Sequence, residues 1–223
     1  MHHLRRMIWA AVLAGLVAGL VSAGLIEWRI APLIASAETY EEAAPHTHEA
    51  GAPAHDHAAM PQGAARIALT GLSTVLATIG FALLLGGAAL VLDLPLTLRT
   101  GPLWGLGAFV AVQVMPALVL PLQLPGMAAL DLGTRQTLWL GIATLAGAGL
   151  LLVARLRSTP LRLAGLALAL SPLLIPVALP EGGGVVPPEL ASAFAANSLA
   201  LGALSFAVLG TALGYFSTWR RAP

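Results

Sequence analysis

Four histidines form the most chemically distinctive group in the chain. They lie in residues 45–57, interleaved with two carboxylates: His46, His48, His55, His57, Glu49 and Asp56. In an extended segment alternate side chains share one face, so each i,i+2 histidine pair can chelate one ion. Neutral imidazole and carboxylate together suit Co²⁺, Ni²⁺, Zn²⁺ and Cu²⁺, and the spacing does not separate these metals. The alternative interpretation is a solvated low-complexity linker.

The rest of the chain has the composition of a membrane protein. Of its 223 residues, 58% are hydrophobic and 9% are charged, and the mean hydropathy is +0.86. A soluble domain carries about 25% charged residues. The net charge of +1 gives no reason to expect nucleic acid as a partner. The absence of cysteine excludes disulfides, Fe–S clusters and thiolate metal sites.

Six apolar runs predict an all-α, polytopic membrane protein with six transmembrane helices, and the whole chain, 1–223, forms one integral membrane domain. At 1.5 Å per residue, about 20 residues cross a hydrocarbon core of roughly 30 Å. The expected spans are residues 7–26, 67–92, 103–122, 137–154, 163–179 and 190–216. The first run exceeds the apolar core of a signal peptide, so a retained helix is expected. Its Gly15 and Gly19 would let another helix approach closely.

The charges between these spans predict the orientation. With six spans both termini share one side, and eight of the eleven arginines fall on it. Those eight are Arg5, Arg6, Arg99, Arg155, Arg157, Arg162, Arg220 and Arg221. Positive residues concentrate in cytoplasmic loops, so both termini are expected in the cytoplasm. The His/Glu-rich loop, residues 27–66, is then extracytoplasmic.

Further polar groups in the outer loop, at span ends or within a span are candidates for an ion path or gate. They are Glu38, Glu41, Glu42, Asp93, Arg99, Gln113, Asp131 and Arg135. Ionisable groups at span ends also serve as interfacial anchors or structural ion pairs. Proline residues such as Pro116 free backbone carbonyls, which either line an ion path or mark packing kinks. Residues 102–154 and 161–217 have similar proline-rich exits, which suggests two duplicated helical hairpins or a chance similarity.

Several motifs resemble the CbtA family of predicted cobalt transporter subunits. Residues 32–41 read PLIASAETYE, and residues 93–105 read DLPLTLRTGPLWG. They are followed in order by Leu124-Pro-Gly, Asp131-Leu and Arg135-Gln136. The resemblance runs over nearly the whole length. It implies cobalt uptake feeding cobalamin synthesis in a bacterial inner (plasma) membrane, with a CbtB-like small single-span subunit as partner. The family often carries a Pro-His pair at the fifth-span exit, whereas Val177 follows Pro176 here.

Three hypotheses follow for the function. In the first, the chain is a membrane subunit of a divalent metal uptake transporter, in which the outer loop gathers the ion, by resemblance cobalt, and a helical bundle conducts it. In the second, it is a non-transporting accessory or assembly protein that presents metal to a partner. An enzyme is disfavoured, because no metalloprotease, catalytic-triad or cofactor motif is present. No tightly bound cofactor is expected, the lipid bilayer is a partner, and a homo-oligomer is left open.

Overall fold

The computed structural model describes residues 2–43, 63–178 and 184–218, and within these ranges the chain is helical with no strand. The N-terminal elements are α1 (His2–Leu25), the π-helix η1 (Ile26–Ile30), α2 (Ala31–Ala43) and α3 (Ala64–Val91). Next come α4 (Gly101–Phe109), the π-helix η2 (Val110–Val114), α5 (Met115–Val119) and α6 (Leu132–Arg155). The chain ends with α7 (Thr159–Leu170), the 3₁₀ turn η3 (Ser171–Leu174) and α8 (Pro188–Thr218).

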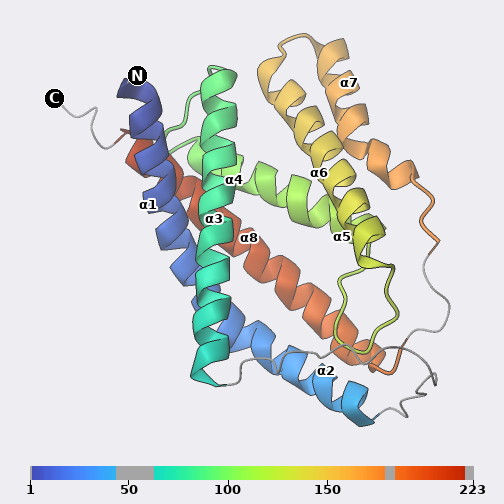
Figure 1. Cartoon of the computed structure of the whole chain (residues 1–223). Helices are drawn as coiled ribbons and strands as arrows, with labels where there is room; N and C mark the ends of the chain where they lie inside the picture. The colour runs from blue at the N-terminus through green and yellow to red at the C-terminus, as the bar shows by residue number, and fades with distance from the viewer. Residues whose placement is uncertain (1, 44–62, 179–183, 219–223) are drawn as a thin grey trace.

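Five helices in the described part of the chain are long and apolar enough to cross a membrane. They are His3–Ala43, Ala64–Val91, Gly101–Val119, Leu132–Arg155 and Pro188–Thr218. Figure 1 shows that α1 begins and α8 ends at one end of the molecule, whereas α2 lies across the other end. The all-α fold and the membrane class are therefore confirmed.

The fifth expected span, residues 163–179, differs from the sequence-based expectation. Its α-helix, α7, has 12 residues, or about 18 Å at 1.5 Å per residue, well short of the bilayer core. Pro172 lies in the short turn η3, and Ile175 is extended with Pro176 after it. A residue that precedes proline disfavours the helical conformation, which explains why the helix stops early.

Residues 27–43, the first part of the polar segment 27–66, are also more helical than the sequence suggested. The first helix continues through η1 into α2 as far as Ala43. Pro32 is tolerated because it is the second residue of α2, where the preceding helix has already changed its hydrogen-bonding pattern. α2 then packs through Ala37 against Leu124 and Val186, so it covers one end of the bundle.

Glycines set the closest helix contacts. A Cβ on Gly15 would meet the backbone of Ile79, and one on Gly19 would lie 2.7 Å from Val75 Cα. The expected close approach at this glycine pair is thus confirmed, and its partner is α3. On the opposite side of the core, α4 meets α8 through Gly101, Gly105, Gly210 and Gly214.

The backbone carbonyl that Pro116 leaves without a helical partner accepts a hydrogen bond from a neighbouring helix. Pro116 has no N–H, so the carbonyl of Val112, four residues earlier, loses its regular helical partner. The indole Nε1 of Trp139 on α6 donates to that oxygen at 3.1 Å. At this position the packing interpretation of proline holds, because the carbonyl is occupied by a neighbouring helix.

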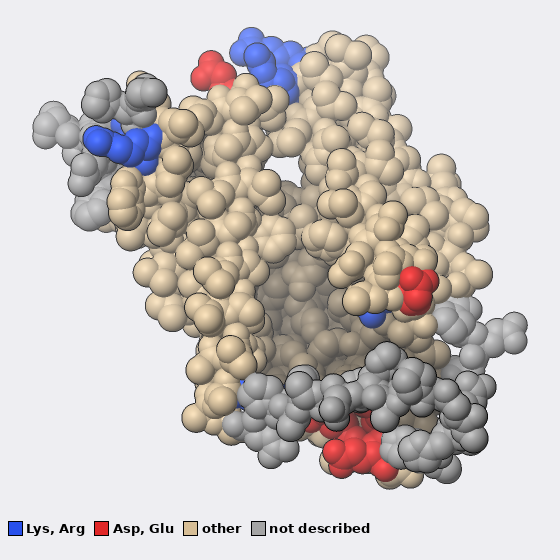
Figure 2. Space-filling view, viewed as in Figure 1, with Lys and Arg blue, Asp and Glu red and all other residues tan. Residues whose placement is uncertain are grey.

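The helices form two groups joined by the bent α4–η2–α5 helix. One group contains α1, α3 and α8, and the other contains α6 and α7. η2 and α5 contact α6, while α4 contacts α8. Figure 2 shows a hollow between α3 and α6 whose visible walls are largely uncharged, and most of the charged atoms of the described residues gather near the two ends of the molecule.

Candidate functional site: an uncharged cavity between α1, α3, η2 and α8

A cavity of about 370 Å³ lies where α1, η1, α3, η2 and α8 meet. It is flanked by apolar side chains, including Phe81 and Leu209, and no ionisable side chain of the described residues lines it. Its polar lining residues are Ser22, Thr74, Thr78, Gln113, Ser198 and Ser205. Six water volumes of about 30 Å³ each amount to about 180 Å³, so the cavity has room for a hydrated cation.

Two hydroxyl groups in this lining donate their hydrogen bonds to backbone carbonyls of their own helices. Ser22 Oγ donates to the carbonyl of Ala18 at 2.7 Å, and Thr78 Oγ1 donates to that of Thr74 at 2.6 Å. A hydroxyl has one hydrogen and two acceptor lone pairs. Both oxygens therefore act only as acceptors toward the cavity, which is the polarity that a cation requires.

Gln113 is oriented in the same sense. Its Nε2 donates to the carbonyl of Ser198 on α8 at 3.3 Å, which leaves Oε1 as an acceptor. The side-chain amide lies over Gly202, where an added Cβ would collide with Oε1 and approach the amide carbon to 2.6 Å. The lack of a side chain at Gly202 thus makes the space that Gln113 occupies.

Both π-helical segments contact consecutive residues of α8. Arg29 in η1 donates through Nε to Asn197 Oδ1 at 3.0 Å, and Gln113 in η2 contacts Ser198. Asn197 is itself fixed by a bond from Nδ2 to the carbonyl of Ala193, at 2.7 Å. Single-turn π segments occur frequently at functional sites because they displace side chains from regular helical register. Here they direct two polar side chains to the same turn of α8.

The residues expected to capture metal cannot be placed. His46, His48, His55, His57, Glu49 and Asp56 all lie outside the described residues. Within the described ranges, no group of three or more His, Asp and Glu side chains is arranged to hold a metal ion. The central cavity consequently offers neutral oxygens, which bind a divalent cation less tightly than carboxylate and imidazole do.

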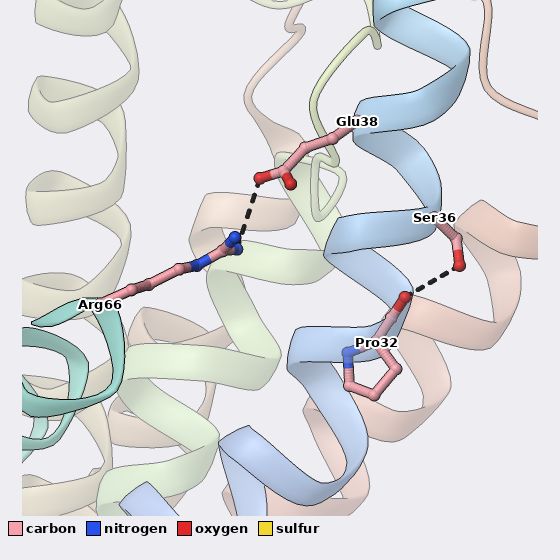
Figure 3. Close-up of polar contacts among 4 residues, drawn as sticks. All are labelled: Pro32, Ser36, Glu38 and Arg66. Carbon is pink, nitrogen blue, oxygen red and sulfur yellow. Dashed lines mark hydrogen bonds and ion pairs between the residues drawn. The ribbon is translucent and has the colours of Figure 1, made fainter. Parts of the chain in front are cut away.

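The acidic side chains of α2 lie near the covered end of the bundle. Glu38 Oε1 pairs with Arg66 Nη2 at 3.3 Å, which ties α2 to the start of α3 (Figure 3). Both side chains are about two-fifths exposed, so the pair contributes at most about 1 kcal/mol. Glu41 lies against the turn at Gly126, with its Cβ 3.3 Å from where a Cβ of that glycine would be. Glu42 is exposed.

Asp131 is a helix cap. Its Oδ1 accepts a hydrogen bond from the backbone N–H of Thr134 at 2.9 Å, at the start of α6. The Thr134 side chain and then its backbone N–H lower the pKa of Asp131 below the ordinary value. Arg135, four residues on, forms no ion pair with it: the one ion pair within the described residues joins Glu38 and Arg66. The structure thus shows Asp131 as a helix cap, and a role for it as a gate stays a prediction.

The capping interaction predicts a pH dependence. Because the folded state lowers this pKa, the stabilisation is present at neutral pH and is lost as the pH falls below about 4. We expect Asp131→Ala to lower the thermal midpoint at pH 7, and Asp131→Asn to retain most of it because asparagine also caps helices. Thermal unfolding in detergent at pH 7 and at pH 3 tests this. Equal differences between wild type and Asp131→Ala at both pH values would contradict the capping role.

Asp93 and Arg99 lie at the other end, between α3 and α4. Asp93 is exposed and lines a second cavity, together with residues of the first two turns of α1. Arg99 is exposed and is not part of either cavity. Of the eight residues expected to form an ion path or gate, only Gln113 lines the central cavity.

Comparison with known proteins identifies the family. Residues 4–218 match the family described as "Probable cobalt transporter subunit (CbtA)". The chain belongs to the CbtA family. Neither a curated protein nor a solved structure matches it. The description as a subunit of a transporter implies partner subunits, and the apolar helices agree with a place in the membrane.

Sequence reasoning found only part of the polar site in this CbtA-family chain. Gln113 was recognisable as a polar residue in an apolar run, but the serines and threonines were not distinguishable from ordinary helix residues. One signal was available: Thr74 and Thr78 are four apart and so share a helix face. Arg29 and Asn197 are 168 positions apart, and nothing in the sequence connected them.

Proposed function

We propose that this CbtA-family chain is the ion-conducting subunit of a cobalt uptake transporter. The outer loop with His46, His48, His55 and His57 collects the ion, and the central cavity passes it through the bundle. The observation that carries the proposal is a cavity without fixed charge whose hydroxyl and amide oxygens act as acceptors. A conducting site must bind the ion well enough to admit it and weakly enough to release it.

The proposed topology has six crossings with both termini in the cytoplasm. α7, η3 and the non-helical residues 175–178 form the fifth crossing, which brings the chain back toward the end covered by α2. The described arginines support the orientation. Arg5 and Arg6 lie in the first turns of α1, and Arg99 lies between α3 and α4. The end of α6, the connection to α7 and the first turn of α7 carry Arg155, Arg157 and Arg162, at the same end of the molecule. Excess positive charge marks the cytoplasmic side.

The partner in this proposal is a CbtB-like subunit with a single membrane span. The hollow between α3 and α6 in Figure 2 offers a largely uncharged surface on which one further helix can pack. The transport role and the accessory role then differ in a simple way. In a host with no other route for cobalt, a chain that only presents metal gives no cobalt uptake when it is expressed with its partner. A conducting subunit does give uptake in the same cells.

Removing the outer imidazoles tests the collecting step. In the quadruple variant, alanine replaces His46, His48, His55 and His57. We expect it to take up much less cobalt than the wild-type protein at trace metal and only slightly less at saturating metal, because a collecting site raises the local concentration of the ion. Uptake of Co²⁺, Ni²⁺ and Zn²⁺ by expressing cells is measured at both concentrations. Thr47→Ala with Gln62→Ala, in the same loop, is the control. If uptake by the quadruple variant equals uptake by the wild-type protein at both concentrations, the loop is only a linker.

A further inference from the structure

A second cavity lies at the end of the bundle where α1 begins, opposite α2. Its volume is about 470 Å³, and it is bounded by the start of α1, the segment after α3 and the end of α8. Among the described residues, three ionisable side chains line it: His3, Arg6 and Asp93. A cavity of this size accommodates a divalent cation with its hydration shell, which occupies about 180 Å³.

The three ionisable groups converge from two elements. His3 and Arg6 are three residues apart on α1 and so share a helix face. Asp93 follows the end of α3 in a left-handed backbone conformation, with φ of 50°, which aspartate tolerates better than most residues. Within the described ranges none of these three side chains forms an ion pair or a hydrogen bond with another residue. All three are thus available to a ligand.

We propose that this cavity is a weak divalent-cation site with the His3 imidazole and the Asp93 carboxylate as its protein ligands. Imidazole and carboxylate together suit Co²⁺ and similar ions, and water completes the coordination shell. Ser217 adds an acceptor, because its Oγ donates to the carbonyl of Leu213 at 2.6 Å and keeps its lone pairs. Met7 contributes its thioether side chain to the same wall.

Arg6 sets the affinity of this site. Its fixed positive charge repels a cation held by His3 and Asp93, and at surface-like screening this weakens binding by about fivefold. A site with two protein ligands and an opposing charge releases its ion readily. In the proposed transport cycle, the ion leaves the bundle through this cavity. This exit role rests on the proposed function, whereas the binding of the ion does not.

Direct binding measurements test the site. The full chain with His46, His48, His55 and His57 changed to alanine is purified in detergent, and Co²⁺ binding is followed by equilibrium dialysis. We expect a residual weak site whose Kd rises at least fivefold in His3→Asn or Asp93→Asn and falls about fivefold in Arg6→Gln. Arg5→Gln is the matched control, because Arg5 does not line the cavity, and it should leave Kd unchanged. Asparagine at position 93 keeps the left-handed backbone accessible.

The results separate this site from the transport proposal. No residual binding, or one Kd shared by all the variants, would overturn the site, whatever the uptake assay shows. Binding that depends on His3 and Asp93, in a chain whose cavity variants transport normally, would support the site and contradict the central pathway. Thermal midpoints of the variants should match, because His3 and Asp93 are exposed and their side chains form no hydrogen bond or ion pair with another described residue.

Discussion

Changing Gln113 to leucine is expected to lower cobalt uptake by about tenfold or more while the protein still inserts in the membrane. The side-chain amide supplies the cavity with an oriented acceptor oxygen, and its Nε2 anchors that orientation on the carbonyl of Ser198. An interaction of a polar group with a charged one contributes about 1.5–3 kcal/mol, and 1.4 kcal/mol corresponds to tenfold. Leucine has a similar volume and offers no acceptor. Initial uptake rates at saturating Co²⁺, normalised to the amount of protein in the membrane, measure the effect.

A neighbouring glycine provides an independent version of the same test. In Gly202→Ala the new methyl group collides with the amide of Gln113, which must swing away because it is the flexible partner. We expect reduced uptake with little loss of stability. Gly80→Ala on α3 is the control, since nothing lies within 4 Å of an added Cβ there. Wild-type uptake in both Gln113→Leu and Gly202→Ala would exclude Gln113 from the ion path.

The second large effect concerns stability: Gly105→Ala should destabilise the bundle by about 1–3 kcal/mol, the usual cost of overpacking. An added Cβ would collide with the carbonyl oxygen of Phe206 on α8, and this backbone atom cannot rotate away as a side chain does. Helix α4 must therefore separate from α8. The thermal midpoint of the purified protein in detergent measures the change.

The matched control for this substitution lies one half-turn further along the same helix. Gly107→Ala adds the same methyl group, and nothing lies within 4 Å of it. Alanine has a higher helix propensity than glycine by about 1 kcal/mol, so this variant should be as stable as the wild type or slightly more stable. Equal losses in Gly105→Ala and Gly107→Ala would show that the α4–α8 contact is looser than described.

The sequence predicted the helical membrane fold better than the site. Long uncharged runs define spans because the bilayer fixes their length, and the glycine pair Gly15 and Gly19 indicated a close helix contact. The sequence could not indicate that α3 is the partner of this glycine pair, because the partner depends on how each helix is oriented about its own axis. The early end of α7 depends on the spacing of Pro172 and Pro176, which the hydropathy of residues 163–179 conceals.

The candidate site was harder to predict for a physical reason. A carboxylate or histidine stands out in an apolar sequence, so Asp131 was noticed, although it caps α6. Ser22 and Thr78 do not stand out, because hydroxyl side chains are common in membrane helices and bond their own backbone. Their role depends on where the remaining lone pairs face, and this is decided only when α1, α3, η2 and α8 assemble.

The most direct test of the central claim uses the absence of cysteine from the natural chain. A single cysteine is placed at Ser205, which lines the central cavity, and in a matched variant at the adjacent Leu204, which is 49% exposed on the outside of the bundle. Labelling by a membrane-impermeant, water-soluble thiol reagent is then followed in membranes with and without Co²⁺. We expect Ser205→Cys to react, Co²⁺ to slow the reaction, and Leu204→Cys to be unreactive within the bilayer. No labelling of Ser205→Cys, or labelling that Co²⁺ does not affect, would contradict a cation pathway through this cavity.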